Sequence, residues 1–156
     1  MQDCHFTAPG IWFRFRAAAV IIEDGCVLLA SNDAHDYYYS VGGGVHAGET
    51  AKDAVIRETY EETGVMYEVD RLLFVHENFF LGEDNKTHCH EISFYFLMKS
   101  RGTKELNSNS YCAYGKEHMN WIPIKDLKNH TAYPVFFADK LQNLPCGIEH
   151  IVTSEL

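Results

Sequence analysis

The segment of residues 42–65, GGGVHAGETAKDAVIRETYEETGV, constrains the fold of this chain more than any other part of the sequence. Residues 51–63 are predicted to form an α-helix, because Thr50 is a favourable N-cap residue and Asp53 follows it three positions later. Gly64 stands where the end of a helix favours a residue in the left-handed conformation. A glycine-rich stretch therefore leads directly into a helix with defined ends.

Acidic residues continue the apolar face of this predicted helix. Because successive residues advance about 100° around a helix axis, one line along the surface, within about 40°, collects Ala51, Val55, Glu58 and Glu62. Glu61 lies on the flank of the same face. Burying unpaired carboxylates is costly, so a positive charge must compensate them. Arg57 could pair with one, but hard cations such as Mg²⁺ or Mn²⁺ match a cluster of three better, since they prefer oxygen ligands.

The glycines before the helix supply the second part of a candidate site. Gly42, Gly43, Gly44 and Gly48 allow the backbone to approach a ligand closely and to present its polar groups outward. The loop leads into a helix N-terminus, where free N–H groups and the helix dipole favour anions. Carboxylates that bind a metal beside a loop that accepts phosphate are the equipment for metal-assisted attack of water on a phosphoanhydride.

The spacing of these residues resembles the signature of the Nudix hydrolases, G-x5-E-x7-R-E-U-x-E-E-x-G-U, where U is a bulky aliphatic residue. The matching positions are Gly43, Glu49, Arg57, Glu58, Glu61, Glu62, Gly64 and Val65. Thr59 departs from the pattern at the first U position, which concerns packing more than chemistry. A later segment, with Glu117 four residues before Trp121, also looks like the family.

The resemblance implies an α/β fold, a Nudix-type α/β/α sandwich around a mixed β-sheet, formed by residues 1–156 as one domain. It implies Mg²⁺, with Mn²⁺ as the alternative, bound by Glu58 and Glu62, with Glu61 sharing that duty and the Gly42 carbonyl as a backbone ligand. Arg57 would hold a glutamate of the motif in place, and Glu49 would tie the loop to the helix.

The implied reaction is hydrolysis of a small nucleotide in which a nucleoside diphosphate is linked to another group. A nucleoside triphosphate, an oxidised nucleotide, and a nucleotide sugar or ADP-ribose type of substrate all stay open. The alternative is a catalytically silent domain that senses a nucleotide, and the complete set of acidic residues argues against it. Gly43 and Gly44 are expected to contact the substrate.

The general base is expected at Glu91, which follows His88, Cys89 and His90 at the start of a predicted strand, with Glu77 as the rival. His90 is expected near the substrate. His88 and His90 could share one zinc ion, but no second ligand pair stands at a recognised zinc spacing.

Aromatic residues offer a flat surface for the nucleobase of a substrate. Phe79 and Phe80, with the tyrosines of residues 37–39, could stack on it, although most of these side chains are expected in the core.

Other segments predict a mixed set of strands and one more helix. The expected strands are residues 13–30 as a pair around a turn, 71–78, 91–99, 119–124 and 149–153, with a helical turn at 126–130 and a helix at 134–144. The glycines of residues 42–44 are expected to interrupt regular structure, and residues 106–115 to form a loop.

Composition excludes several classes of protein. The net charge is −9 and no cluster of Lys or Arg appears, so duplex nucleic acid is not an expected partner. The longest apolar run has six residues, 17–22, against the about 20 that a membrane-spanning helix needs. Five scattered cysteines without a Cys-x-x-Cys pair, and a start without a secretory pattern, predict free thiols in the cytoplasm. The oligomeric state stays open, with a homodimer among the alternatives.

Overall fold

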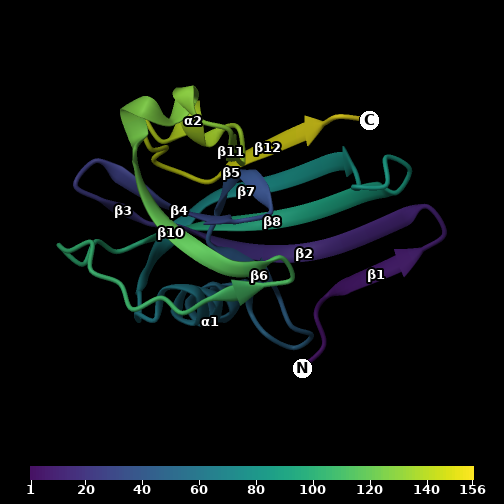
Figure 1. The fold of residues 1–156 in the computed structure, drawn as a ribbon, viewed down its shortest axis with the longest axis horizontal. Coiled ribbons are helices and arrows are strands. Elements are labelled where there is room, and N and C mark those ends of the chain that lie inside the picture. The colour runs from purple at the N-terminus through teal and green to yellow at the C-terminus, as the bar shows by residue number, and fades with distance from the viewer.

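The computed structural model describes residues 1–156 and contains twelve β-strands, two α-helices and one 3-10 helix (Figure 1). In chain order these are β1 (His5–Ala8), β2 (Ile11–Val20), β3 (Ile22–Glu23), β4 (Cys26–Asn32), β5 (His35–Ser40), β6 (Gly42–Gly44), α1 (Ala51–Thr63), β7 (Val69–Leu81), β8 (His88–Met98), β9 (Tyr111–Cys112), β10 (Gly115–Pro123), η1 (Ile124–Asn129), β11 (Ala132–Tyr133), α2 (Phe137–Lys140) and β12 (Glu149–Ser154).

The strands form two mixed sheets. The first sheet has the order β1-β2-β8-β7-β12, and β6 pairs with β2. The second sheet has the order β11-β5-β4-β10-β9, and β3 pairs with β4. Parallel pairs join β2 to β8, β7 to β12 and β5 to β11, and all other pairs are antiparallel. The predicted α/β class is confirmed, but the structure has two mixed sheets where one was predicted.

Helices cover the strands from two sides, as Figure 1 shows, with α1 below the strands and α2 above them. Two separate hydrophobic clusters form as a result, one that includes Val55 of α1 and one that includes Leu127 of η1 and Phe137 of α2. Strand β2 contributes to both, because successive strand residues point to opposite faces. Ala17 belongs to the α1 cluster and Ala18 to the other, and both are fully buried.

Helix α1 begins and ends where the sequence predicts. The Thr50 Oγ1 atom accepts a hydrogen bond from the Asp53 N–H at 3.1 Å, which satisfies a free donor of the first turn. Gly64 ends the helix with a φ of 70°, and its N–H donates to the Tyr60 carbonyl at 2.8 Å. The helix is therefore fixed by local signals before any tertiary contact is considered.

Three sequence predictions are wrong in detail. The glycines of residues 42–44 do form a strand, β6, because the small side chains of β2 allow close pairing of Gly42 with Ala18 and of Gly43 with Ala17. Of the helix expected at residues 134–144, only α2 (Phe137–Lys140) forms. The N–H groups of residues 137–139 bond to carbonyls three residues back, as in turns. Strand β9 lies within the loop expected at residues 106–115.

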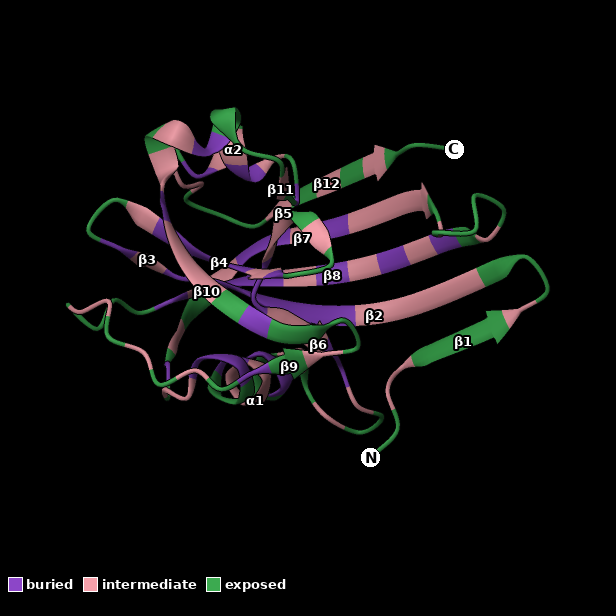
Figure 2. Ribbon diagram, viewed as in Figure 1, coloured by how far each residue is buried: buried purple, intermediate pink, exposed green.

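Strand β1 is an element that the sequence did not suggest. It pairs with the start of β2, and most of its residues are exposed (Figure 2). No helix of the structure has the length and apolar character needed to cross a membrane.

Candidate hydrolytic site

An acidic cleft of about 480 Å³ lies beside α1, next to the start of β6. Its lining joins the glycine loop, one face of the helix and a segment that comes from a distant part of the chain. These residues are Gly42, Glu58, Glu61, Glu62, Asn109, Ser110, Tyr111, Cys112 and Glu117. Four carboxylates thus face one opening, and three of them come from a single turn and a half of helix.

Glu62 is the most deeply buried of these carboxylates, with 8% of its surface exposed. Its Oε1 atom accepts a hydrogen bond from the Gly42 N–H at 2.8 Å, whereas its buried Oε2 atom has no partner. Burial, with a further contribution from the negative charge of Glu117, raises the pKa of Glu62 to about 8. An uncompensated carboxylate oxygen in such surroundings calls for a cation.

Glu58 lies directly against the glycine loop. A Cβ atom added to Gly43 would stand 2.4 Å from its Oε2 atom, so only glycine leaves room for this carboxylate. Burial raises the pKa of Glu58, and the adjacent Arg57 opposes that shift. The Glu61 side chain is 56% exposed and lies 3.6 Å from Arg57, so it is the most exposed carboxylate of the cleft.

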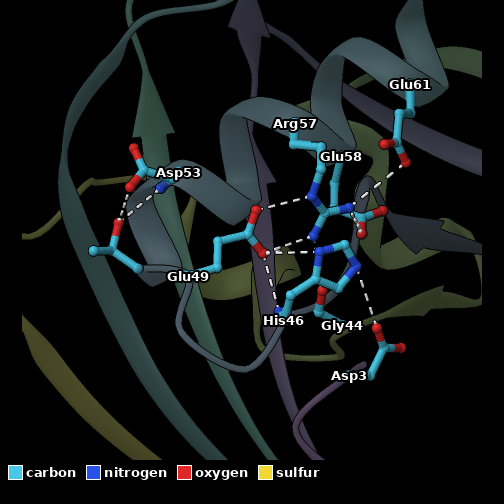
Figure 3. Close-up of polar contacts among 9 residues, drawn as sticks. Asp3, Gly44, His46, Glu49, Asp53, Arg57, Glu58 and Glu61 are labelled. Carbon is cyan, nitrogen blue, oxygen red and sulfur yellow. Dashed lines mark hydrogen bonds and ion pairs between the residues drawn. The ribbon is translucent and has the colours of Figure 1, made fainter. Parts of the chain in front are cut away.

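Arg57 connects the loop with the acidic residues, as Figure 3 shows. Its guanidinium donates to both carboxylate oxygens of Glu49, each at 2.9 Å, to Glu58 Oε1 at 2.5 Å and to the Gly44 carbonyl at 3.0 Å. The hydrogen bonds from Arg57 lower the pKa of Glu49 to about 2. Such paired, charge-assisted bonds fix both position and orientation.

The donor set of the cleft fits a hard divalent cation. Carboxylate and carbonyl oxygens are the ligands that Mg²⁺ and Mn²⁺ prefer, and the unpartnered Glu62 Oε2 atom points to a missing positive charge. No three acidic, histidine or cysteine side chains close around one point. The Gly42 carbonyl accepts a hydrogen bond from Arg16 Nη2 at 3.1 Å. A cation bound by this carbonyl would therefore share the oxygen with Arg16.

Glu117 is the one carboxylate of the cleft to which sequence reasoning assigned no role. It accepts hydrogen bonds from the Tyr39 hydroxyl at 2.6 Å and from the Ser110 hydroxyl at 2.5 Å, and it is 8% exposed. The only signal was its place four residues before Trp121. Its approach to Glu62 depends on the pairing of β10 with β4, which a local pattern does not reveal.

A second, larger cavity of about 580 Å³ adjoins the cleft, and Glu117 and Cys112 line both. Its lining includes two arginines, Arg14 and Arg16, and a ring of aromatic side chains. These aromatic residues are Tyr37, Tyr39, Phe80, Tyr95, Tyr114, Tyr133 and Phe136. We call this space the aromatic cavity. It offers apolar faces beside the place where the carboxylates gather.

The two arginines of the aromatic cavity are held by protein groups. Arg16 donates to the Ser40 hydroxyl at 3.0 Å and to the Ser40 carbonyl at 2.6 Å. Burial opposes its charge, but Tyr95 and Glu91 nearby outweigh burial and raise the pKa of Arg16. Arg14 pairs with Glu91 through both Nε and Nη2. Little positive charge is left free on these walls.

The two candidate bases lie on opposite faces of the first sheet. Glu91 lines the aromatic cavity, where Arg14 and Ser93 also bind its carboxylate. Burial raises the pKa of Glu91, but the charges of Arg14 and Arg16 outweigh it, so the net shift is downward. Glu77 faces the other side, where it pairs with His150 at 2.7 Å. Of the two, only Glu91 faces a cavity.

The expected substrate residues are divided in the same way. Phe80 lines the aromatic cavity, whereas Phe79, one residue earlier on β7, points to the opposite face and stacks on His90 at 4.3 Å. Gly43 and Gly44 line neither cavity, because Glu58 and Asp3 occupy the space beside them. His88 and His90 gain no third ligand for zinc. Of the five expected substrate residues, Phe80 alone lines one of the two cavities, and Gly43, Gly44, Phe79 and His90 line neither.

The raised pKa of Glu62 predicts an unusual pH dependence of stability for the cation-free protein. The folded state keeps a proton on Glu62 that the unfolded state releases above its ordinary pKa of 4.5, so the free energy of unfolding falls as pH rises from about 4.5 to about 8. The steepest slope from one group is about 1.4 kcal/mol per pH unit.

Urea unfolding at several pH values checks this expectation, with Glu62→Gln as the control that should flatten the curve. Glu49 acts in the opposite sense, but only between pH 2 and 4.5, because its pKa is lowered to about 2. Stability that stays constant or rises between pH 5 and 8 would contradict the burial of an uncompensated carboxylate.

Comparisons with known proteins agree with this geometry. The family model described as NUDIX domain matches residues 13–140. Diphosphoinositol polyphosphate phosphohydrolase 2 of Homo sapiens is 37% identical over 140 residues, covering 86% of this chain and 72% of that protein. Its namesake from Rattus norvegicus is 39% identical over 140 residues, with coverages of 86% and 73%. The MutT protein of Bacillus halodurans matches the fold with a TM-score of 0.69 at 18% identity, covering 91% of each chain.

Proposed function

Because this chain belongs to the Nudix hydrolase family, whose members hydrolyse pyrophosphate bonds, we propose that it is a Mg²⁺-dependent pyrophosphohydrolase of a nucleoside diphosphate linked to another group. The observation that carries the proposal is the buried Glu62 carboxylate, which lines the acidic cleft beside Glu58 and Gly42 with one oxygen unpartnered. Mn²⁺ is the alternative cation.

The charge of the aromatic cavity supports a nucleoside derivative over a diphosphoinositol polyphosphate, the substrate that the relatives' names give for those proteins. Its lining contains two arginines and three glutamates, Glu91, Glu117 and Glu155, and no lysine. A ligand with phosphates around a whole ring needs a cluster of free cationic groups. Aromatic walls instead suit the flat face of a base.

Three carboxylates of the cleft and the adjacent Arg57 have distinct roles in this proposal. Glu58 and Glu62 would hold the cation, which when bound polarises the phosphate and lowers the pKa of water. Arg57 fixes Glu58 against the loop. Glu61 would accept the proton of the attacking water, because its carboxylate is exposed whereas that of Glu91 is held by Arg14 and Ser93.

A panel of phosphoanhydrides tests the substrate class. It includes nucleoside triphosphates, an oxidised nucleotide, a nucleotide sugar, ADP-ribose and a diphosphoinositol polyphosphate, each with Mg²⁺, with Mn²⁺ and with a chelator. We expect at least one nucleotide to exceed the inositol compound in kcat/KM by about a hundredfold, since a site without free cations leaves many phosphates unpaired. Chelation should abolish turnover, and product analysis identifies the bond that breaks.

A matched pair of variants tests, in the same assay, whether the nucleobase of the substrate binds in the aromatic cavity. Phe80→Ala removes a wall of the aromatic cavity and is expected to raise KM about tenfold, which corresponds to one lost stacking contact. Phe79→Ala alters the other face of the same strand and should leave KM unchanged.

In the substrate panel, preference for the inositol compound would overturn the proposed substrate class. Thermal stabilisation by nucleotides without any product would favour the nucleotide sensor.

A further inference from the structure

The extreme N-terminal residues form a short antiparallel contact with the glycine loop. The Cys4 N–H donates to the Val45 carbonyl at 2.7 Å, and the Ala47 N–H donates to the Gln2 carbonyl at 2.8 Å. Asp3 stands opposite His46 in this pairing. The Asp3 carboxylate also fills the space beside Gly44, where an added Cβ atom would lie 2.5 Å from Oδ2. The N-terminal segment is therefore part of the wall that holds the loop.

His46 lies between two carboxylates, as Figure 3 shows. Its Nε2 atom is 3.4 Å from Asp3 Oδ1, and its Nδ1 atom is 3.6 Å from Glu49 Oε2. Only 18% of the side chain is exposed, and Nδ1 is buried without a hydrogen-bond partner at this distance. The ring thus separates two acidic groups and offers one nitrogen to each.

The contacts continue from Glu49 to the acidic cleft. Both Glu49 oxygens accept hydrogen bonds from Arg57, whose Nη1 atom donates to Glu58 Oε1 at 2.5 Å. Asp3, His46, Glu49, Arg57 and Glu58 therefore lie in one series of polar contacts, in which the His46 backbone N–H also donates to Glu49 Oε2 at 3.0 Å (Figure 3). A displacement of Glu49 would release Arg57 and, with it, the carboxylate of Glu58.

We propose that His46 is a positioning residue, which with Asp3 holds Glu49 and Arg57 so that Glu58 keeps its place in the acidic cleft. Its consequence for catalysis rests on the proposed function. Without the imidazole, Asp3 and Glu49 would lose the ring that separates them, and Glu49 would keep only the His46 backbone N–H and Arg57 as partners. The loop contact would loosen while the core of the domain stayed intact, because His46 lies outside both hydrophobic clusters.

The test compares His46→Ala, His46→Gln, Asp3→Asn and the double variant Asp3→Asn/His46→Ala with the unaltered chain. The first readout is solvent exchange of the Arg57 Nε–H in the cation-free protein, followed by ¹⁵N NMR, because this N–H is held by Glu49 Oε1 at 2.9 Å. We expect about tenfold faster exchange in His46→Ala, a smaller change in His46→Gln, and a double variant no worse than His46→Ala, since coupled residues are not additive.

The second readout is steady-state hydrolysis of a nucleotide from the panel. We expect kcat to fall about tenfold in His46→Ala while KM stays within about twofold, because misplaced catalytic groups cost rate more than binding. His150→Ala is the control, since it breaks a similar histidine–carboxylate pair, with Glu77, on β12 at the edge of the first sheet. It should change neither readout.

Unchanged exchange of the Arg57 Nε–H in His46→Ala, or independent and additive effects of Asp3 and His46, would overturn the assignment. Exchange that rises only in proportion to a lowered unfolding temperature would overturn it as well. If the unaltered protein hydrolyses no nucleotide, the proposed function fails, and the exchange measurement still decides the role of His46.

Discussion

Replacing Glu62 with glutamine is expected to lower the hydrolysis rate by roughly a thousandfold, comparable to removing one key charge-stabilising group from an enzyme site. Glutamine has almost the same shape, and its carbonyl oxygen can still accept the hydrogen bond from the Gly42 N–H. The negative charge is lost, however, and with it the buried ligand that attracts the cation. The effect should therefore appear in activity and in cation binding.

The fold of this variant is expected to survive, because a neutral amide is easier to bury than a carboxylate with an unpartnered oxygen. Steady-state kinetics over a range of Mg²⁺ concentrations, with circular dichroism to monitor folding, measures both properties. The control is Glu68→Gln, an exposed glutamate that pairs with Lys99 just beyond α1. Turnover near that of the unaltered protein would show that Glu62 is not a residue of the hydrolytic site.

Replacing Gly42 with alanine is expected to prevent folding or to lower the free energy of unfolding by more than about 4 kcal/mol. Gly42 has a φ of 141°, which residues with a side chain rarely adopt. The added Cβ atom would lie 2.3 Å from the Ala17 carbonyl oxygen and 2.5 Å from the Ala18 Cα atom. Both belong to the fully buried backbone of β2, so neither can move aside.

Soluble yield and urea unfolding check this expectation, with Gly147→Ala as the control. Gly147 has no heavy atom within 4 Å of an added Cβ atom, so its replacement should change stability by no more than about 0.5 kcal/mol. Equal unfolding midpoints for the two variants would contradict the close pairing of β6 with β2.

Local signals allowed helix α1 and its acidic face to be predicted from the sequence. Thr50 and Gly64 mark its ends, and the position of Glu58 and Glu62 on the apolar face follows from helix geometry alone. The place of the glycine loop beside these carboxylates followed too, because loop and helix are contiguous. Features that depend on neighbours in sequence were therefore accessible without a structure.

The direction in which each strand residue points could not be predicted in this way. Both faces of β7 carry polar and aromatic residues, so alternation does not show whether Phe79 or Phe80 points toward a ligand. The answer depends on which face α1 covers and which face the second sheet approaches. For the same reason Glu117 went unassigned, since only the pairing of β10 with β4 brings it to the cleft.

The acidic cleft and the aromatic cavity meet at Glu117 and Cys112 but have different origins in the chain. Most of the carboxylates that would act on a phosphoanhydride belong to one contiguous stretch, whereas the aromatic walls come from segments scattered between Tyr37 and Phe136. On the proposed function, chemistry and selectivity would therefore be encoded separately. Exchange of a few wall residues would then change the nucleotide that such a domain accepts, while the residues that break the bond stay unchanged.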